Sequence, residues 1–283
     1  MKKIFIVIAA LLMAQSASAQ NCDRECLRGM LTRYLDAMQK HDPNQLPLAA
    51  NVRFTEDTRE LKLGEGLWQH IESLSGFRQD ILDVRKGVAG VHVKVIESGK
   101  PVLVAIRLQV ADNKISEVES TVVRSKEEGM IFNTDAIKEA SAAMNVIPTA
   151  AQRNTREDME RLALLYPKGL SLGSFVKADA QFAANAYRFE NGQLMAGPEC
   201  TFFPGCDNIR EQKLPTLANI QAKVAAVDEE QGIVWLRMNF GKGSLMRGEG
   251  ELSVWEMFKV YDGRIHAVEA FMEEVPANTP FLW

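Results

Sequence analysis

Two glutamates near the end of the chain could perform acid–base chemistry. Glu256 and Glu269 lie on either side of Asp262-Gly263, within two runs of alternating residues. A two-residue hairpin loop at Asp262-Gly263 would place the glutamates opposite each other, with both carboxylates on one face. Like charges this close cannot both ionise comfortably in a low dielectric, so the pKa of one carboxyl group should be raised. Such a group beside an apolar pocket suits general acid or base catalysis near neutral pH.

The same pairing divides the predicted hairpin into two faces. Alternation along the strands gives the concave interior both glutamates and Val254, Phe258, Val260, Ile265, Ala267 and Phe271. Phe258 and Phe271 would then contact a substrate. The other, more polar face carries Trp255, Met257, Lys259, Tyr261, Arg264 and His266. Trp255 and Met257 would suit packing against a second domain.

Two alternatives to a catalytic pair stay open at this point. Arg188 or another cation could neutralise Glu256 and Glu269 as a structural ion pair. A β-bulge, which is common in curved sheets, could instead shift the register by one residue and turn one carboxylate to the other face.

A second candidate group is Arg188, Glu190 and Asn191, where a helix is expected to give way to the sheet. Arginine can hold a substrate carboxylate with two parallel hydrogen bonds. The alternative is turn chemistry, with Asn191-Gly192 as a simple bend and a solvated pair between Arg188 and Glu190. Arg53, Glu56 and Asp57 are the counterparts earlier in the chain.

No motif for a metal or a cofactor is visible. The four histidines are far apart and lack metal-ligand spacing. Gly64-Glu65-Gly66 and Gly248-Glu249-Gly250 lack the third glycine and the βαβ setting of a nucleotide site. We therefore expect no cofactor and no metal.

The hairpin that carries the two glutamates is a repeat. Ala105–Ser120 and Trp255–Ala270 have five identical residues and one Lys/Arg pair at a shift of about 150 positions, and each contains a two-residue turn. The chain therefore consists of two copies of one α+β unit. In the first copy the same pairing places Glu119 opposite Ile106, so no carboxylate pair forms. We infer that any chemistry belongs to the second copy.

Helices come first and antiparallel strands second in each copy. Helical spacing covers Cys22–Lys40 in the first copy and Thr155–Tyr166 in the second, and Phe175–Phe189 is expected to be a further helix. Each unit then continues as a meander of strands, with the helix across one face of the sheet. The expected boundaries are 20–125 for the first domain, 126–151 for a linker and 152–283 for the second domain.

The first nineteen residues resemble a cleaved signal peptide. Lys2-Lys3 precedes the apolar run Ile4–Ala14 and a small-residue cleavage site ending at Ala19. The apolar run is too short to span a bilayer. We expect a periplasmic or secreted protein, in which Cys22–Cys26 and Cys200–Cys206 form two local disulfides.

Net charge argues against two classes of partner. Loss of Lys2 and Lys3 changes the formal charge from −4 to −6. A negative protein is a poor ligand for nucleic acid or an anionic membrane. A small molecule is the expected partner, with pairing of the two domains and possible homo-oligomers.

The order of elements and the closing run Phe258–Ala270 resemble the nuclear-transport-factor-2-like (NTF2-like), or SnoaL/ketosteroid-isomerase-like, superfamily. Val52–Asp57 and Tyr187–Gly192 follow the helices in each copy, and LKLGEGLW, VDEEQGIV and the last nine residues look like an uncharacterised exported subfamily. The resemblance implies two tandem cone-shaped domains, each with helices packed on a curved antiparallel sheet. It does not imply the Tyr/Asp pair of the isomerase, whose motif has no match here.

Three functions follow as hypotheses. The first is cofactor-free acid–base chemistry of isomerase, dehydratase or lyase type on a small metabolite, with Glu256 and Glu269 catalytic and Arg188 and Asn191 orienting the substrate. The second is non-catalytic binding of a small molecule in the same pocket. The third is a structural pseudo-dimer.

Overall fold

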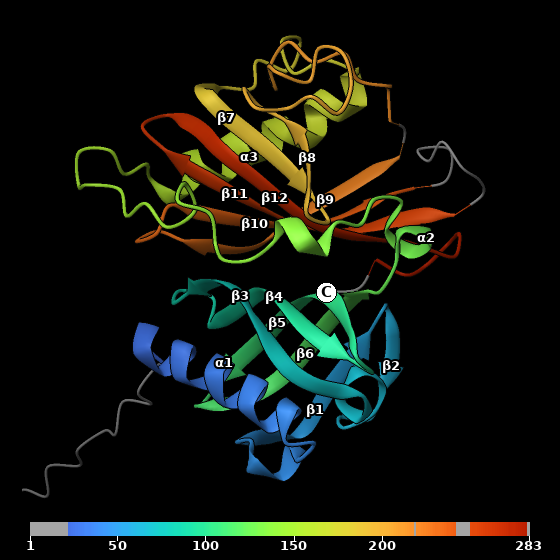
Figure 1. Cartoon of the computed structure of the whole chain (residues 1–283). Coiled ribbons are helices and arrows are strands. Elements are labelled where there is room, and N and C mark those ends of the chain that lie inside the picture. The colour runs from blue at the N-terminus through green and yellow to red at the C-terminus, as the bar shows by residue number, and fades with distance from the viewer. Residues whose placement is uncertain (1–21, 218, 242–249, 282–283) are drawn as a thin grey trace, which may run out of the picture.

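The computed structural model describes residues 22–217, 219–241 and 250–281 as two similar halves, each with one long helix on a six-stranded sheet. The predicted α+β class is therefore confirmed (Figure 1). The expected signal peptide, residues 1–19, lies outside the described residues.

The first half begins with helix α1 and continues as a six-stranded sheet. Its elements are α1 (Arg24–Gln39), η1 (Pro43–Gln45), β1 (Leu48–Glu56), β2 (Arg59–Leu61), η2 (Gly66–Gln69), β3 (Ile71–Asp83), β4 (Val88–Glu97), β5 (Lys100–Ala111) and β6 (Lys114–Val123). The strand order is β2-β1-β6-β5-β4-β3. All neighbours are antiparallel except β1 and β6, so the expected antiparallel sheet is in fact mixed.

The second half repeats this plan with the order β8-β7-β12-β11-β10-β9. Its elements are α2 (Lys126–Gly129), η3 (Thr134–Ala136), α3 (Arg156–Leu172), β7 (Phe182–Glu190), β8 (Gln193–Ala196), β9 (Ile220–Asp228), β10 (Ile233–Phe240), β11 (Glu251–Tyr261) and β12 (Arg264–Val275). The helix expected at Phe175–Phe189 is wrong, because most of that segment is strand β7. Its parallel pairing with β12 outweighs the helix propensity of its alanines.

Each long helix begins at a side-chain cap and buries one apolar stripe. Asp23 accepts a hydrogen bond from the backbone N–H of Cys26, and Thr155 accepts one from Asp158. Helix α3 ends where Gly173 adopts a left-handed conformation at φ 62°. These caps fix where Tyr34 and Tyr166, both buried, lie above their sheets.

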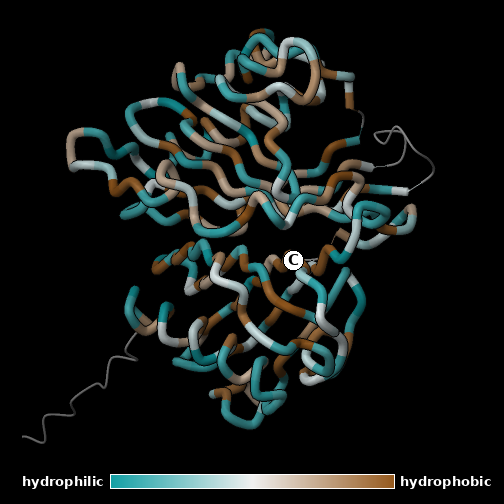
Figure 2. The backbone as a smooth tube through the Cα atoms, viewed as in Figure 1, coloured by the Kyte–Doolittle hydropathy of each residue, from teal (hydrophilic) through white to brown (hydrophobic). Residues whose placement is uncertain are grey.

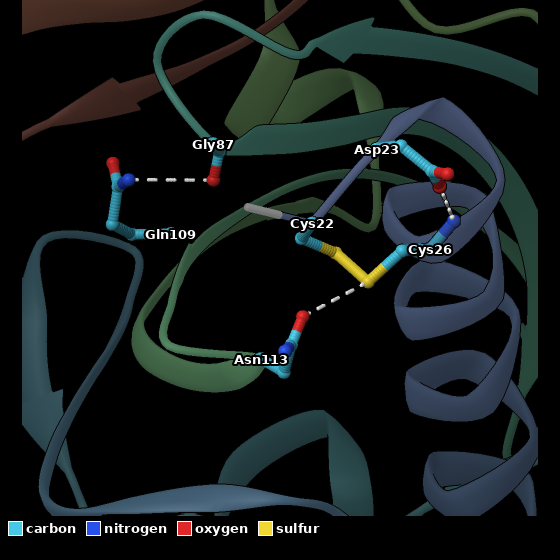
Figure 3. Close-up of a disulfide and its surroundings, with 6 residues drawn as sticks. All are labelled: Cys22, Asp23, Cys26, Gly87, Gln109 and Asn113. Carbon is cyan, nitrogen blue, oxygen red and sulfur yellow. Dashed lines mark hydrogen bonds between the residues drawn. A yellow bond between two sulfur atoms is a disulfide. The ribbon is translucent and has the colours of Figure 1, made fainter. Parts of the chain in front are cut away.

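Both predicted disulfides are present. Cys22–Cys26 closes the start of α1, with Cys26 Sγ 3.5 Å from Asn113 Oδ1 in the β5–β6 turn (Figure 3). Cys200–Cys206 closes a loop between β8 and β9.

The hairpin register differs from the predicted one because a β-bulge interrupts it. Asp262 and Gly263 have positive φ, as the turn requires, and Val260 pairs with Ile265 as predicted. Lys259, however, pairs with Ala267, which leaves one residue unpaired. Beyond the bulge every pair is shifted by one, so Glu256 lies opposite Ala270 and Met257 lies opposite Glu269.

The sheets of the two halves pack face to face, while α1 and α3 cover their outer faces (Figure 1). Hydrophobic segments lie mainly on the strands in both halves (Figure 2). The shared core contains Phe77, Trp235, Trp255, Met257 and Phe271. Trp235 lies against Gly90, where a Cβ would meet its ring at 2.2 Å.

Two buried lysines hold the connecting segment between the halves against the sheets. Lys94 Nζ donates to the carbonyl oxygens of Thr134 and Ile137, and Lys259 Nζ donates to those of Met144 and Val146. The connection is thus an integral layer of the fold, and part of it reaches the site described next.

Candidate functional site

The second half contains a cavity of about 620 Å³ between α3 and the concave face of its sheet. Its wall is mostly apolar and includes Leu170, Phe240, Leu252, Val254, Ala270 and Met272 from the helix and the strands. A cavity of this size and character is typical of a site for a small molecule.

Glu256 is the buried carboxyl group in this cavity. It projects from β11, is 2% exposed, and its Oε2 has no hydrogen-bond partner among the described residues. Burial, with a smaller contribution from Glu190, raises the pKa of Glu256 to about 8, against opposing effects of Arg188 and Tyr166. Glu256 is therefore mostly protonated at neutral pH and can donate a hydrogen bond into the cavity.

Arg188 and Tyr166 connect Glu256 to the rim of the cavity. Arg188 Nη1 donates to the Tyr166 hydroxyl over 3.3 Å, and Arg188 Nε lies 2.9 Å from Glu190 Oε1. A hydrogen bond from Tyr166 also reaches Glu256. Because Glu190 balances the charge of Arg188, the polar end of the cavity is close to neutral when Glu256 is protonated.

Asn191 lies behind the cavity wall and does not line it. Its side-chain amide donates to the carbonyl oxygens of Gly129, Ile131 and Met272, and its Oδ1 accepts from the Met272 N–H. A Cβ at Gly129 would lie 2.3 Å from Asn191 Nδ2, so this approach needs glycine. Asn191 therefore positions the segment after α2, which lines the cavity with Met130, Ile131 and Phe132.

A disulfide-closed loop forms another part of the wall. Phe202 and Phe203 lie between Cys200 and Cys206, and both line the cavity. Phe202 is 55% exposed, which places it at the mouth. Gln212, Lys213 and Leu214 follow in the same connection between β8 and β9.

Three further predicted site residues, besides Asn191, do not line the cavity. Glu269 faces the other half of the chain, where its Oε1 accepts from the Tyr187 hydroxyl at 2.8 Å and from the Ser141 hydroxyl at 2.9 Å. Phe271 belongs to the core between the halves and stacks on His92. Phe258 is on the correct face but packs beneath Tyr166 without lining the cavity.

The predicted carboxylate pair is therefore wrong in its geometry. The bulge between Lys259 and Val260 puts Glu256 and Glu269 on opposite faces of the sheet. The structure brings Glu256, Arg188 and Glu190 together in one cavity.

The first half has lost the equivalent polar group. Sequence and strand pairing place Ile106 at the position of Glu256 and Phe54 at that of Arg188. Tyr34 replaces Tyr166, and its hydroxyl accepts a hydrogen bond from the buried ring of Trp68 at 3.0 Å. The interior of this half is thus a packed apolar core.

The earlier candidates of the first half have structural partners. Both carboxylate oxygens of Glu56 accept from the Leu67 N–H, and Arg124 pairs with Asp57 and Glu97. Arg53 lies on the exposed side of β1, 3.5 Å from Glu60.

No group of three or more His, Cys, Asp or Glu side chains within the described ranges could hold a metal ion. Among the helices described, none has the length and apolar character needed to cross a membrane.

Sequence reasoning missed the residues that reach the cavity from outside the sheet. Tyr166 was recognisable only as a helix residue of the apolar stripe, and Met130–Phe132 lie within the expected linker. The signal that could have found Phe202 and Phe203 is their place in a short loop between two cysteines.

Comparisons with known proteins give one family match and several distant structural ones. Residues 152–272 match a family described as "Domain of unknown function (DUF8021)". The match covers the half that contains the cavity. Comparison with curated protein sequences gives no match.

Solved structures similar to this chain include a de novo designed protein with a curved β-sheet, at 18% identity and a TM-score of 0.31, covering 35% of this chain and 87% of that one. A "putative ketosteroid isomerase" from Kribbella flavida DSM 17836 matches at 15% identity with a TM-score of 0.29. The match covers 36% of this chain and 80% of that one. AclR, a "putative hydroxylase" from Streptomyces galilaeus, matches at 12% identity with a TM-score of 0.29. The match covers 36% of this chain and 81% of that one. These structural similarities are distant.

Proposed function

We propose that the second half binds a small, largely apolar molecule that carries a carbonyl or similar oxygen, and that Glu256 performs cofactor-free acid–base chemistry on it. One observation carries the proposal: Glu256 Oε2 is buried at an apolar cavity and has no hydrogen-bond partner among the described residues. A buried polar atom left unpaired costs about 1–3 kcal/mol, which a ligand oxygen can recover.

The charges beside Glu256 favour a neutral ligand oxygen there. Arg188 is already paired with Glu190, and Glu256 is mostly protonated below pH 8. An anionic group at this end of the cavity would have to displace Glu190 from Arg188, whereas the exposed Lys126 and Lys213 line other parts of the wall. A neutral carbonyl oxygen can accept a hydrogen bond from Glu256 without disturbing that pair.

One carboxyl group is sufficient for a proton shuttle. The ionised form of Glu256 removes a proton from a carbon next to the carbonyl group, and the protonated form returns it to another carbon of the same molecule. Tyr166, held by Arg188, keeps the carboxyl group oriented. Returned to another carbon, the proton completes an isomerisation. Given instead to a hydroxyl group on the β-carbon, it completes an elimination in which the C–O bond breaks and water leaves, and neither reaction needs a cofactor.

Non-catalytic binding is the second candidate. It is favoured by the position of Glu269, since the predicted second carboxylate does not reach the cavity. In this case Glu256 would hold the ligand and transfer no proton.

We also infer that the protein is exported. The basic, apolar start of the chain supports this, and so do the two disulfides, which persist in oxidising compartments. Export would expose the cavity to molecules of the periplasm or the surroundings.

The deciding experiment incubates a metabolite extract with the chain from Gln20 to Trp283 and follows all compounds by mass spectrometry. Glu256→Gln is the test variant, and Glu269→Gln, on the opposite face, is the matched control. A compound consumed by the wild type and the control but not by Glu256→Gln supports catalysis. A compound that is only retained through desalting supports binding, and unchanged conversion by Glu256→Gln contradicts the proposal.

A further inference from the structure

A second hollow, of about 260 Å³, lies between the two halves of the chain. Lys86, Arg107 and Glu119 line it from the first half, and Lys223, Arg237 and Trp255 line it from the second. It is separate from the cavity of Glu256, since the two share no lining residue.

The charges around this hollow are positive in sum. Arg237 Nε donates to Glu119 Oε1 at 3.0 Å, and Arg107 Nη2 donates to Glu117 Oε2 at 2.7 Å, so two arginines are matched by two glutamates. Two ammonium groups remain. Lys86 Nζ donates to the Val224 carbonyl at 2.8 Å, whereas Lys223 Nζ lies 4.7 Å from the centre of the Phe281 ring.

An unused hydrogen-bond donor lies in the same place. Trp255 is fully buried, and its Nε1–H has no hydrogen-bond partner among the described residues. Buried donors of this kind are nearly always paired, so an unpaired one needs an explanation. Together with the excess positive charge, it indicates a partner that is both an acceptor and an anion.

The pseudo-symmetry of the chain shows that the fold does not need these charges. Arg237 pairs with Trp255 in the sheet of the second half. The counterpart of Trp255 in the first half is Ala105, about 150 positions earlier, and Ala105 pairs with His92. His92 is therefore the counterpart of Arg237. By the same shift Met257 corresponds to Arg107 and Ala267 to Glu117. That side of the contact is closed by packed side chains, including His92 stacked on Phe271.

Burying Arg107 and Arg237 beside the hollow therefore carries a desolvation cost, which the packed side chains around His92 and Phe271 do not carry. Arg237 and Arg107 are 3% and 6% exposed, and burial of such groups weakens a fold unless they gain strong partners. An arrangement that buries charge and still leaves a hollow is typical of a binding site.

We propose that this hollow binds a small oxyanion, a carboxylate or a phosphate, between Lys223, Arg237 and the Trp255 N–H. Charge-assisted hydrogen bonds from these groups would hold the anion, and Lys86 would attract it from solution. Because residues of both halves line the hollow, the bound anion would also stabilise their association.

The test is isothermal titration calorimetry of the chain from Gln20 to Trp283 with inorganic phosphate and with succinate, at neutral pH and constant ionic strength. Lys223→Gln should weaken binding about tenfold, since one charge-assisted hydrogen bond is lost. Trp255→Phe keeps an aromatic side chain but removes the N–H donor and part of the indole ring, so it should weaken binding by a smaller factor, and urea denaturation checks that the variant is folded. Lys177→Gln, at an exposed lysine of the same half, is the matched control and should bind as the wild type does.

Each outcome decides the proposal. Binding of either anion that Lys223→Gln weakens and Lys177→Gln does not supports it, and the anion that binds more tightly distinguishes phosphate from carboxylate. The proposal is overturned if neither anion binds with a dissociation constant below about 1 mM, or if Lys223→Gln binds the anion as tightly as the wild type does. Glu256→Gln should leave anion binding unchanged, so this test is independent of the proposed function.

Discussion

Arg156, the first residue of α3, forms a double hydrogen bond with Asp83 at the end of β3 in the other half, at 3.0 and 2.5 Å. The relationship is reciprocal: Arg24, the first residue of α1, binds Asp228 at the end of β9 at 2.7 and 2.9 Å. Each aspartate also accepts a backbone N–H of the opposite half, Val227 for Asp83 and Leu82 for Asp228. The two halves are thus joined by two equivalent Arg–Asp contacts, one from each long helix.

We predict that Asp83→Asn lowers the free energy of unfolding by about 3 kcal/mol, because the buried Arg156 loses its double partner and keeps only Glu160 and the more distant Glu229. Asp228→Asn should have a smaller effect, since the side chain of Arg24 is 17% exposed and solvent can compensate. Denaturation by urea measures both values.

The double variant Asp83→Asn/Arg156→Leu is the control for that prediction. It removes the arginine charge and keeps an amide oxygen at position 83 that can accept from the Val227 N–H, so much of the lost stability should return. If the double variant is less stable than Asp83→Asn, Arg156 stabilises the fold without Asp83 and the stated cause is wrong.

The repeat and the fold class could be predicted from the sequence because they depend on local signals. Asp262-Gly263 fixes a turn with positive φ at both positions, and apolar spacing fixes α1 and α3. Strand β7 could not be predicted, since its alanines favour a helix and only its partner β12 makes it a strand.

The site could be predicted only in part, and one extra residue explains the error. Val260 pairs as predicted, but the bulge beyond it moves Glu269 and Phe271 to the face between the halves. The sequence does not show the bulge, although the first hairpin has one at the equivalent place, between Gln109 and Val110. Arg188, Glu190 and Glu256 line one cavity, because the first two lie at the end of strand β7, which pairs with β12 of the hairpin.

Glu256 and Glu269 give opposite predictions for function and stability. Glu256→Gln should lower the turnover of a substrate by a factor of about 10²–10⁴, the usual contribution of a positioned acid or base. Glu269→Gln should leave turnover unchanged and lower the free energy of unfolding by about 1 kcal/mol, because it weakens the bonds from Ser141 and Tyr187. Steady-state kinetics and urea denaturation of both variants measure these effects. Loss of turnover in Glu269→Gln would mean that the reaction takes place on the sheet face between the halves and not in the Glu256 cavity.

The raised pKa of Glu256 predicts a pH-dependent stability. The folded protein holds this proton up to about pH 8, whereas the ordinary value is 4.5, so the folded state binds more protons in between. Stability from this group is therefore fully present below pH 4.5 and is lost as the pH rises towards 8. Glutamine does not ionise, so Glu256→Gln should not show this loss of stability with rising pH.

Urea denaturation of wild type and Glu256→Gln from about pH 5 to about pH 9 checks the sign. The variant should gain stability relative to the wild type as the pH rises. Taking the difference between the two proteins cancels other raised groups, such as Glu273, whose pKa burial raises to about 9. A difference that is constant with pH would mean that Glu256 is ionised in the folded protein.

The two disulfides should have different effects on the cavity. Cys200–Cys206 restrains the loop that presents Phe202 and Phe203 to the ligand, whereas Cys22–Cys26 lies at the start of α1 in the other half. Without the first bridge the loop must be ordered when a ligand binds, so Cys200→Ser/Cys206→Ser should weaken binding of an apolar fluorescent dye about tenfold. Cys22→Ser/Cys26→Ser is the matched control and should lower stability while leaving dye affinity unchanged. Dye titrations of the folded variants measure both, and an equal loss of affinity in the two would place the dye outside the Glu256 cavity.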